Sequence, residues 1–187
     1  MMRRILPVVT LCAMGAAQGA AAAESEFQIA GHVGGGDLRI DRFVAPDDDF
    51  HAPSNIVGVG GGLGYLTPFG LVLEAGADSF GQIDFFGSDR FSLTQQYVGV
   101  GYQFELGHRW RFVPKVGRAR WALRAKEGPL FNPGPELERT IRGYDYYWEV
   151  SLSRRISRVV ALGVSYKQGD YDFGHPHATS FVVTLGF

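Results

Sequence analysis

The residue types that could carry out hydrolysis or bind a metal gather near the C-terminal end of the chain. His175 and His177 flank a proline, and Asp170, Asp172 and Ser180 lie close by in the sequence. A Ser–His pair can act as nucleophile and base, and histidines with carboxylates can bind a metal ion. A His-x-His sequence in a connection is a weak signal, however, and no nucleophile motif surrounds Ser180. We therefore predict no catalytic residues, no metal site and no cofactor.

An acidic run at residues 47–49 and a glycine-rich run at residues 58–62 are two further candidate binding motifs. The acidic run lacks the alternating ligand spacing of an EF-hand. This favours a solvated acidic connection over a divalent-cation site. The glycines of the second run alternate along a strand pattern, and no helix pattern follows them. We therefore exclude a phosphate-binding loop.

Charged side chains within alternating segments form the strongest candidate constellation. They fall on the face opposite the apolar one, which we take as the inner face. These inward residues are Glu74, Asp78, Asp145 and Glu149, together with Arg111, Lys115 and Lys167. Opposite charges enclosed together should pair, because an unpaired buried charge costs several kcal/mol. We predict an ion-pair network that fills a lumen, and the alternative is a gated ion path along the same residues.

The elements that would position these charges are eight segments with the two-residue period of a β-strand. The sixth segment is the clearest, with Tyr146 and Trp148 on one face and Asp145 and Glu149 on the other. The opposite register would place both carboxylates on the apolar face, so burial energy fixes the assignment. The eight segments are residues 27–34, 56–66, 71–78, 93–104, 110–123, 140–153, 159–167 and 179–187.

The connections between these segments alternate in length. Those at residues 35–55, 79–92, 124–139 and 168–177 are long, whereas those at Thr67, Gly107 and Arg155 are tight turns. Long connections at one end and short turns at the other are typical of outer-membrane barrels. Aromatic residues fall where two interfacial girdles belong, namely Tyr65, Phe69, Phe104, Trp110 and Phe187 low, and Tyr144, Tyr146 and Tyr166 high. We predict an all-β, eight-stranded antiparallel up-and-down transmembrane β-barrel, with a soluble β-sandwich as the architectural alternative.

Two stretches depart from the regular pattern. By strict alternation Arg118 and Arg120 fall on the outward face of the fifth segment. Either a β-bulge shifts the register there, or these arginines lie at the outer interface near lipid phosphates. The second long connection is unusually apolar and contains Phe80, Ile83, Phe85, Phe86 and Phe91. We expect these residues to pack as an extension above the membrane, and the alternative is a binding patch.

The N-terminus has the features of a secretory signal peptide. Arg3 and Arg4 precede an apolar stretch, and small residues at positions 21–23 offer a cleavage site. We predict a signal peptide at residues 1–23 and one barrel domain at residues 24–187. The single cysteine, Cys12, follows Leu11 rather than the small residue of a lipoprotein signal, so the mature chain has no thiol. Its 16 basic and 19 acidic residues give a net charge of −3, which offers no basis for nucleic-acid binding.

Two stretches carry a family resemblance: residues 97–104 followed by residues 112–117, and the terminal Thr184–Phe187. They resemble the small outer-membrane barrels of the OmpA/OmpX type, and the resemblance covers residues 24–187. It implies insertion in the outer membrane of a Gram-negative bacterium, among outer-membrane lipids and lipopolysaccharide. It also implies that the barrel-assembly machinery recognises a final strand ending in Phe187.

The resemblance specifies the fold better than the activity, because one fold hosts many functions. We predict a structural or surface-interaction role through four long extracellular connections that could meet a surface ligand, and no enzymatic activity. One alternative is a small low-conductance porin. The other is a lipid A-modifying outer-membrane enzyme. Some lipid A deacylases are barrels with a Ser–His pair on the lipid face, whereas the alternation points Ser180 inward.

Overall fold

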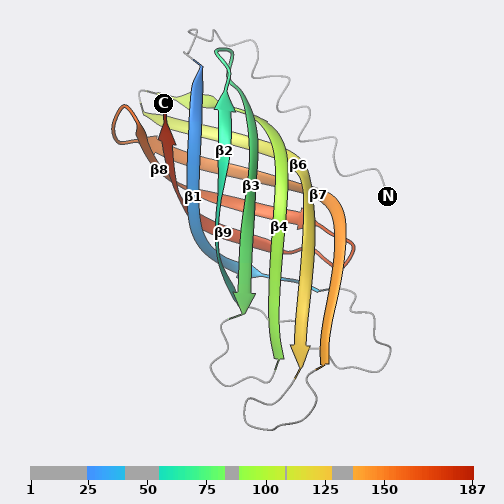
Figure 1. The fold of residues 1–187 in the computed structure, drawn as a ribbon. Helices are drawn as coiled ribbons and strands as arrows, with labels where there is room; N and C mark the ends of the chain where they lie inside the picture. Colours follow the sequence, from blue (N-terminus) through green and yellow to red (C-terminus); the bar gives the residue numbers. More distant parts are fainter. Residues whose placement is uncertain (1–24, 41–54, 83–88, 108, 128–136) are drawn as a thin grey trace.

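The computed structural model describes residues 25–40, 55–82, 89–107, 109–127 and 137–187 as an all-β fold (Figure 1). The predicted signal peptide and the acidic run at residues 47–49 lie outside these residues. The strands are β1 (Glu26–Asp37), β2 (Ile56–Leu66), β3 (Leu71–Gln82), β4 (Asp89–Tyr102), β5 (Phe104–Leu106), β6 (Trp110–Glu127), β7 (Leu137–Arg155), β8 (Val160–Asp170) and β9 (His177–Gly186).

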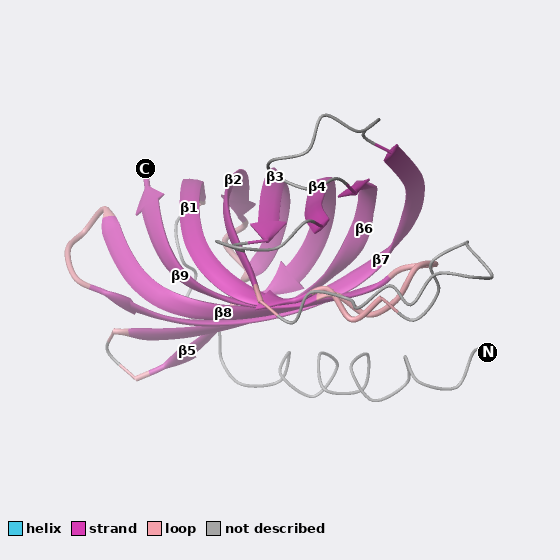
Figure 2. Ribbon diagram, turned by 90° about the horizontal axis from the view of Figure 1, so that it is seen from below, coloured by secondary structure: helices cyan, strands magenta, loops and turns pink. Residues whose placement is uncertain are grey.

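These strands form one closed antiparallel barrel. The sheet order runs β4-β3-β2-β1-β9-β8-β7-β6-β5, and β4 also pairs with β6, which closes the ring. Because β4 and β5 pair with successive parts of β6, they are two parts of one wall strand. The barrel is therefore eight-stranded, as predicted, and its strands curve around a shared interior (Figure 2). Closure leaves no edge strand with a row of unpaired backbone groups.

The break between β4 and β5 lies at Gln103 and has a local cause. The backbone N–H of Gln103 donates to the carbonyl oxygen of Gly70 at 2.8 Å. Gly70 belongs to the turn between β2 and β3 and has a φ of +90°, a conformation that suits glycine and strains other residues. The hydrogen bond ties this turn to the neighbouring wall strand.

One end of the barrel carries the tight turns, and we call it the short-turn end (Figure 1). The N–H of Thr67 donates to the carbonyl of Leu71 at 2.8 Å, and the N–H of Ile156 donates to the carbonyl of Val160 at 2.8 Å. At the same end Phe27 and Phe187 exchange two backbone hydrogen bonds, of 3.1 and 2.9 Å. These bonds join the start of β1 to the last residue of the chain and complete the closure.

The opposite, long-connection end has an uneven rim. β6 and β7 contain 18 and 19 residues, whereas β8 and β9 contain 11 and 10. Several strands extend into stretches that the sequence analysis assigned to connections: β3 continues to Gln82, β4 begins at Asp89, and β6 continues to Glu127. Those predicted boundaries were wrong, because inward apolar residues such as Phe80 and Phe91 continue the strand alternation toward the long-connection end.

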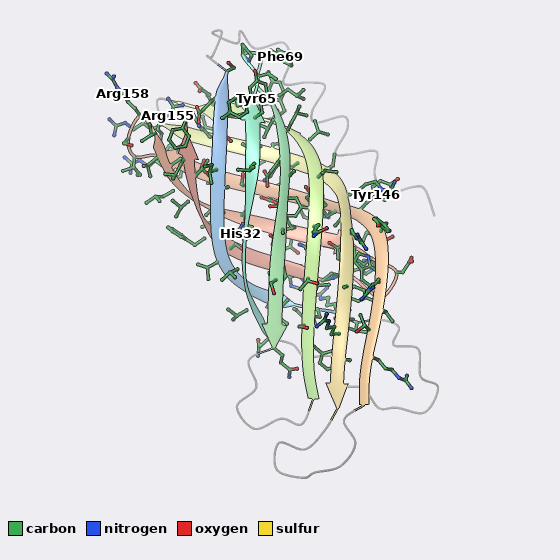
Figure 3. The ribbon with its side chains drawn as sticks, viewed as in Figure 1. His32, Tyr65, Phe69, Tyr146, Arg155 and Arg158 are labelled. Carbon is green, nitrogen blue, oxygen red and sulfur yellow. The ribbon has the colours of Figure 1, made fainter. Side chains whose placement is uncertain are left out.

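The outer face of the barrel is apolar and the alternation is as predicted. Exposed residues of this face include Ile29, Val33, Val57, Val59, Leu63, Leu73, Val98, Val164, Phe181 and Val183. The aromatic residues Tyr65 and Phe69 lie at the short-turn end, as do Arg155 and Arg158 of the turn between β7 and β8 (Figure 3). Among the described residues no helix is long and apolar enough to cross a membrane.

The register of β6 decides between the two explanations of its outward arginines. β6 pairs with β7 without a gap from Trp110 opposite Arg154 to Glu127 opposite Leu137. Its pairing with β4 is equally continuous over the range from Lys115 to Glu127. The structure therefore contains no bulge in this strand, and Arg118 and Arg120 lie on the outward face.

We predict that Val59→Arg destabilises the barrel by about 2–4 kcal/mol, because it places a charge near the middle of the lipid-facing band. Val59 is 60% exposed and lies in the middle of β2. Val159, which is 47% exposed in the turn before β8, offers a matched control. Urea unfolding in lipid vesicles should show a loss for Val59→Arg and less than about 1 kcal/mol for Val159→Arg. Equal losses would mean that this face does not contact lipid.

Candidate functional site

The interior of the barrel holds a buried ion cluster at mid-height. The ammonium of Lys115, on β6, lies 2.6 Å from Oε2 of Glu74 on β3 and 2.8 Å from Oε1 of Glu149 on β7. The side chains of all three residues are about nine-tenths buried. Such close pairing offsets part of the cost of removing these charges from water.

A second ammonium extends this cluster toward β1. The Nζ of Lys167, on β8, lies 2.9 Å from Oδ2 of Asp78 and 3.5 Å from Oε2 of Glu149. His32 on β1 places its Nε2 2.9 Å from the other oxygen of Asp78. The same ammonium lies 3.6 Å from the ring centre of Tyr97, close enough for a cation–π contact. Glu149 thus bridges both lysines and joins the two halves into one network.

Five of the seven predicted lumen charges meet in this network, and the other two lie apart. Glu74, Asp78, Lys115, Glu149 and Lys167 form the network. Arg111 instead pairs with Glu26 at 3.4 Å, near the short-turn end. Asp145 accepts hydrogen bonds, at 2.8 Å from the indole N–H of Trp121 and at 3.2 Å from the backbone N–H of Asp172.

Sequence reasoning missed two members of the lumen. His32 lies within the first predicted segment, residues 27–34, but nothing in a lone histidine indicates an acidic partner on another strand. Glu26 was left outside the first predicted segment, which began at Phe27. Glu26 lies two residues before Gln28 and therefore on the same face of the strand. Extending the predicted segment by one residue would have placed Glu26 in the lumen.

Above the ion cluster, toward the long-connection end, the lumen is filled by apolar side chains. The members of this apolar plug come from β2, β3, β4 and β6, from Leu38 just after β1, and from the β8–β9 connection. They include Leu38, Ile56, Phe80, Phe91, Leu93, Trp121, Leu123, Tyr171 and Phe173. Leu38, Leu123 and Phe173 are at most 2% exposed. The burial of Phe80 and Phe91 agrees with the predicted extension of the barrel, and the remaining apolar residues of that connection, 83, 85 and 86, lie outside the described residues.

Aromatic packing holds the β8–β9 connection inside the mouth of the barrel. The Trp121 ring stacks on Tyr171 at 5.7 Å between centroids and meets Phe173 edge-on at 4.8 Å. The hydroxyl of Tyr171 donates to the side-chain oxygen of Gln95, whose amide donates to Asp78 in the ion cluster. Burial, with the charges of Asp78 and Asp145, raises the pKa of the Tyr171 hydroxyl, so this group stays protonated as a donor. The plug and the ion cluster are thus one connected structure.

Inward glycines make room for the large side chains that cross the lumen. A Cβ atom on Gly76 would lie 2.5 Å from the hydroxyl of Tyr97, and one on Gly99 would lie 2.3 Å from the hydroxyl of Tyr147. A Cβ atom on Gly60 would lie 2.2 Å from Asp78 and 2.3 Å from His32. The glycines on the inner faces of β2, β3 and β4 therefore leave room for large and charged side chains, several of them on the directly paired strand.

Below the ion cluster, toward the short-turn end, the lumen opens into a cavity of about 60 Å³. Polar residues in its lining include Gln28, Gln103, Arg111, Ser151 and Ser153. A polar cavity of this size can hold water. The lumen therefore has three layers, which are an apolar plug, an ion cluster and a polar cavity.

The candidate hydrolytic residues do not converge on the lipid face. Ser180 is buried in β9 opposite Ser165 and Gly34, on the inward phase of the strand. His175 is exposed in the β8–β9 connection and pairs with Asp170 at 3.1 Å. The ring of His177 packs near Tyr166, with 5.9 Å between ring centres. Within the described part of the chain, no group of three or more His, Cys, Asp or Glu residues could hold a metal ion.

A family model and several solved structures match this chain. The model described as "outer membrane protein beta-barrel domain" matches residues 8–187. The attachment invasion locus protein Ail of Yersinia pestis is 11% identical, with a TM-score of 0.63 over 88% of this chain and 100% of that one. Neisserial surface protein A is 14% identical, with a TM-score of 0.54 over 87% and 96% of the two chains. The N-terminal barrel domain of Pseudomonas aeruginosa OprF is 14% identical, with a TM-score of 0.54 over 88% and 98%. The search of the curated proteins gave no match.

We predict that Gly60→Ala destabilises the barrel by about 1–3 kcal/mol, because an added methyl group must displace the buried, ion-paired carboxylate of Asp78 and the neighbouring ring of His32. Gly31 on β1 is the matched control, since a Cβ atom there would meet nothing within 4 Å. Urea unfolding of the refolded variants should show a loss for Gly60→Ala and none for Gly31→Ala. Equal stability of Gly60→Ala and the wild type would mean that the inner face is loosely packed.

Proposed function

The chain belongs to the outer membrane protein beta-barrel domain family, and on this premise we propose that it is a non-conducting barrel with a structural or surface-contact role. It is an integral protein of the outer membrane of a Gram-negative bacterium. The observation that carries the proposal is the filled lumen, in which the ion cluster lies directly below the apolar plug. With the interior closed, the long connections are the part of the molecule free to meet other molecules outside the cell.

The ion cluster supports a structural role for the lumen charges. Lys115 contacts two carboxylates within 2.8 Å, and all three groups are buried. An ion crossing the barrel would have to displace these groups, and each would then lose its partner in a poorly hydrated site. Eight-stranded barrels have interiors just wide enough for side chains to fill. We therefore propose a closed lumen rather than a low-conductance pore.

An enzymatic role finds no support in the geometry of Ser180. Its side chain is buried in β9 on the inward phase, whereas a lipid-modifying serine would have to reach the lipid. His175 contacts Asp170, and the ring of His177 packs near Tyr166. We propose that the protein is not an enzyme.

The orientation and biogenesis of the barrel complete the proposal. The signal peptide at residues 1–23 would direct export and leave residues 24–187 as the mature chain. The short-turn end would face the periplasm and the long-connection end the exterior, as is usual for such barrels. Phe187, 70% exposed at the end of the closing strand, would serve as the signal that the barrel-assembly machinery recognises.

We expect purified protein in planar lipid bilayers to give no conductance above the protein-free baseline, because the lumen charges and the plug leave no continuous water path. Insertion must be verified on the same preparation by the change in gel migration between unboiled and boiled samples.

Discrete conductance steps from inserted protein would contradict the proposal. The variant Lys115→Gln would then locate the path, since a change in its ion selectivity would place the conducting route through the lumen. The same steps unchanged in Lys115→Gln would indicate a route elsewhere, such as one between barrels.

The surface-contact role predicts that the first long connection is needed for adhesion. Cells that display the wild type should adhere to plates coated with basement-membrane extract more strongly than cells displaying a variant with residues 41–54 replaced by Gly and Ser. The control is a variant in which residues 128–136 are replaced by the same number of Gly and Ser residues. It tests whether adhesion depends on the first connection alone or on any connection of the rim. Equal adhesion of all three cell types and of cells without the protein would leave only a structural role.

A further inference from the structure

Four arginines and two tyrosines form an outward patch on β6 and β7 near the long-connection end. This arginine–tyrosine patch consists of Arg118, Arg120, Arg124, Arg142, Tyr144 and Tyr146. In the β6–β7 register Arg118 lies opposite Tyr146, Arg120 opposite Tyr144, and Arg142 opposite Ala122. All six side chains are exposed on the outer face, where Figure 3 shows Tyr146 on the outside of the barrel wall, away from the turn that carries Arg155.

The tyrosine rings hold two of the guanidinium groups in place. The guanidinium carbon of Arg118 lies 5.1 Å from the ring centre of Tyr146, and that of Arg120 lies 5.7 Å from the ring centre of Tyr144. Both distances allow cation–π attraction. A ring face uses none of the N–H donors of arginine, so these donors stay free for an acceptor. Within the described residues, none of the four arginines of the patch forms an ion pair.

The neighbouring strands leave the positive charge of the patch largely uncompensated. On β4 the residues opposite Arg118, Arg120 and Arg124 are Val98, Gln96 and Ser92, all uncharged. On β8 the residue opposite Tyr146 is Asp170, whose carboxylate lies 3.1 Å from Nδ1 of His175 and, among the described residues, forms no ion pair with an arginine of the patch. The patch therefore presents several unpaired positive charges on one side of the barrel.

The height of the patch places it at the outer boundary of the membrane. Arg118 and Arg120 follow Trp110, a residue of the short-turn girdle, by eight and ten positions along β6. A rise of about 3.3 Å per residue on a strand tilted by about 40° puts them roughly 20 and 25 Å above Trp110. The apolar band of such barrels is about 25 Å tall, so the guanidinium groups reach the level of the lipid headgroups.

From these observations we propose that the arginine–tyrosine patch is a binding site for the phosphate groups of lipid A, the lipid anchor of lipopolysaccharide. Planar guanidinium groups bind phosphate through two parallel hydrogen bonds, and neighbouring arginines can share one phosphate. The outer leaflet of this membrane is built largely of lipopolysaccharide, whose phosphates lie at the interface. The proposal rests on the orientation given under the proposed function and is independent of conductance and adhesion.

The patch is one-sided, which distinguishes it from a general interfacial belt. β1, β2 and β9 form the wall across the barrel from β6 and β7. At a comparable height their paired outward residues Gly35, Val57 and Thr179 carry no charge. A general attraction to anionic lipid would need no such localisation. A lipid A molecule should therefore occupy a defined position against β6 and β7.

The test measures lipid A retention by the detergent-solubilised barrel in native mass spectrometry. The wild type should retain diphosphorylated lipid A and release dephosphorylated lipid A. The double variant Arg118→Gln/Arg120→Gln should bind lipid A at least about tenfold more weakly, because it loses two charge-assisted sites for phosphate. Arg154→Gln/Arg158→Gln is the matched control, because both arginines are exposed at the short-turn end of the barrel. Arg154 also has an aromatic partner, since its guanidinium carbon lies 5.9 Å from the ring centre of Trp110. The control should bind as the wild type does.

Three results would overturn the proposal. One is equal retention by the wild type and Arg118→Gln/Arg120→Gln. Another is retention of dephosphorylated lipid A equal to that of lipid A. The third is displacement of lipid A by an equal concentration of phosphatidylglycerol, which would mean that the patch binds any anionic lipid.

Folding of each variant is checked by its gel shift on boiling. If Arg118→Gln/Arg120→Gln does not fold, Arg124→Gln/Arg142→Gln replaces it, because these residues lie nearer the rim and have no aromatic partner among the described contacts. The variant Arg118→Lys/Arg120→Lys adds a finer readout. It keeps the charge but loses the planar fork, so its affinity should fall between those of the wild type and the Gln variant.

Discussion

The structure depends on one constraint, which is that every backbone N–H and C=O within the membrane must find a partner inside the protein. The pairing of β1 with β9 meets this constraint for the two strands that would otherwise be edges. It extends over ten residue pairs and finishes with the two hydrogen bonds between Phe27 and Phe187. Closure then fixes the width of the lumen, and the width forces the interior to be filled by side chains.

The interior satisfies this second requirement by placing small residues beside large ones. Gly60 and Gly76 leave space for Asp78 and Tyr97, their partners on the next strand, and Gly99 leaves space for Tyr147. The charges that enter this space are paired because water has been excluded, and the plug above them excludes it further. Thus the glycines, the ion cluster and the plug are consequences of one narrow ring, and each depends on the others.

The alternation of the sequence was enough to predict the number of strands and their inner and outer faces. It did not predict which side chains contact one another, because these contacts depend on how the strands are placed in three dimensions. Asp145 and Glu149 both point inward, but only the three-dimensional register decides that Asp145 meets Trp121 and Glu149 meets two lysines. The strand ends were also missed, because residues such as Phe80 continue the inward phase of the strand into stretches that were assigned to connections. Cation–π contacts across β6 and β7 follow from a register that the sequence does not fix by itself.

The uneven rim has a consequence for how the protein meets its neighbours. A wall that stands taller along β4, β6 and β7 than along β8 and β9 gives the barrel a front and a back in the plane of the membrane. When the barrel rotates about the membrane normal, the part of the wall that faces an adjacent molecule therefore changes in height and in charge. In a crowded two-dimensional lattice, copies of this barrel would have distinguishable azimuthal orientations, which a cylinder of uniform height would lack.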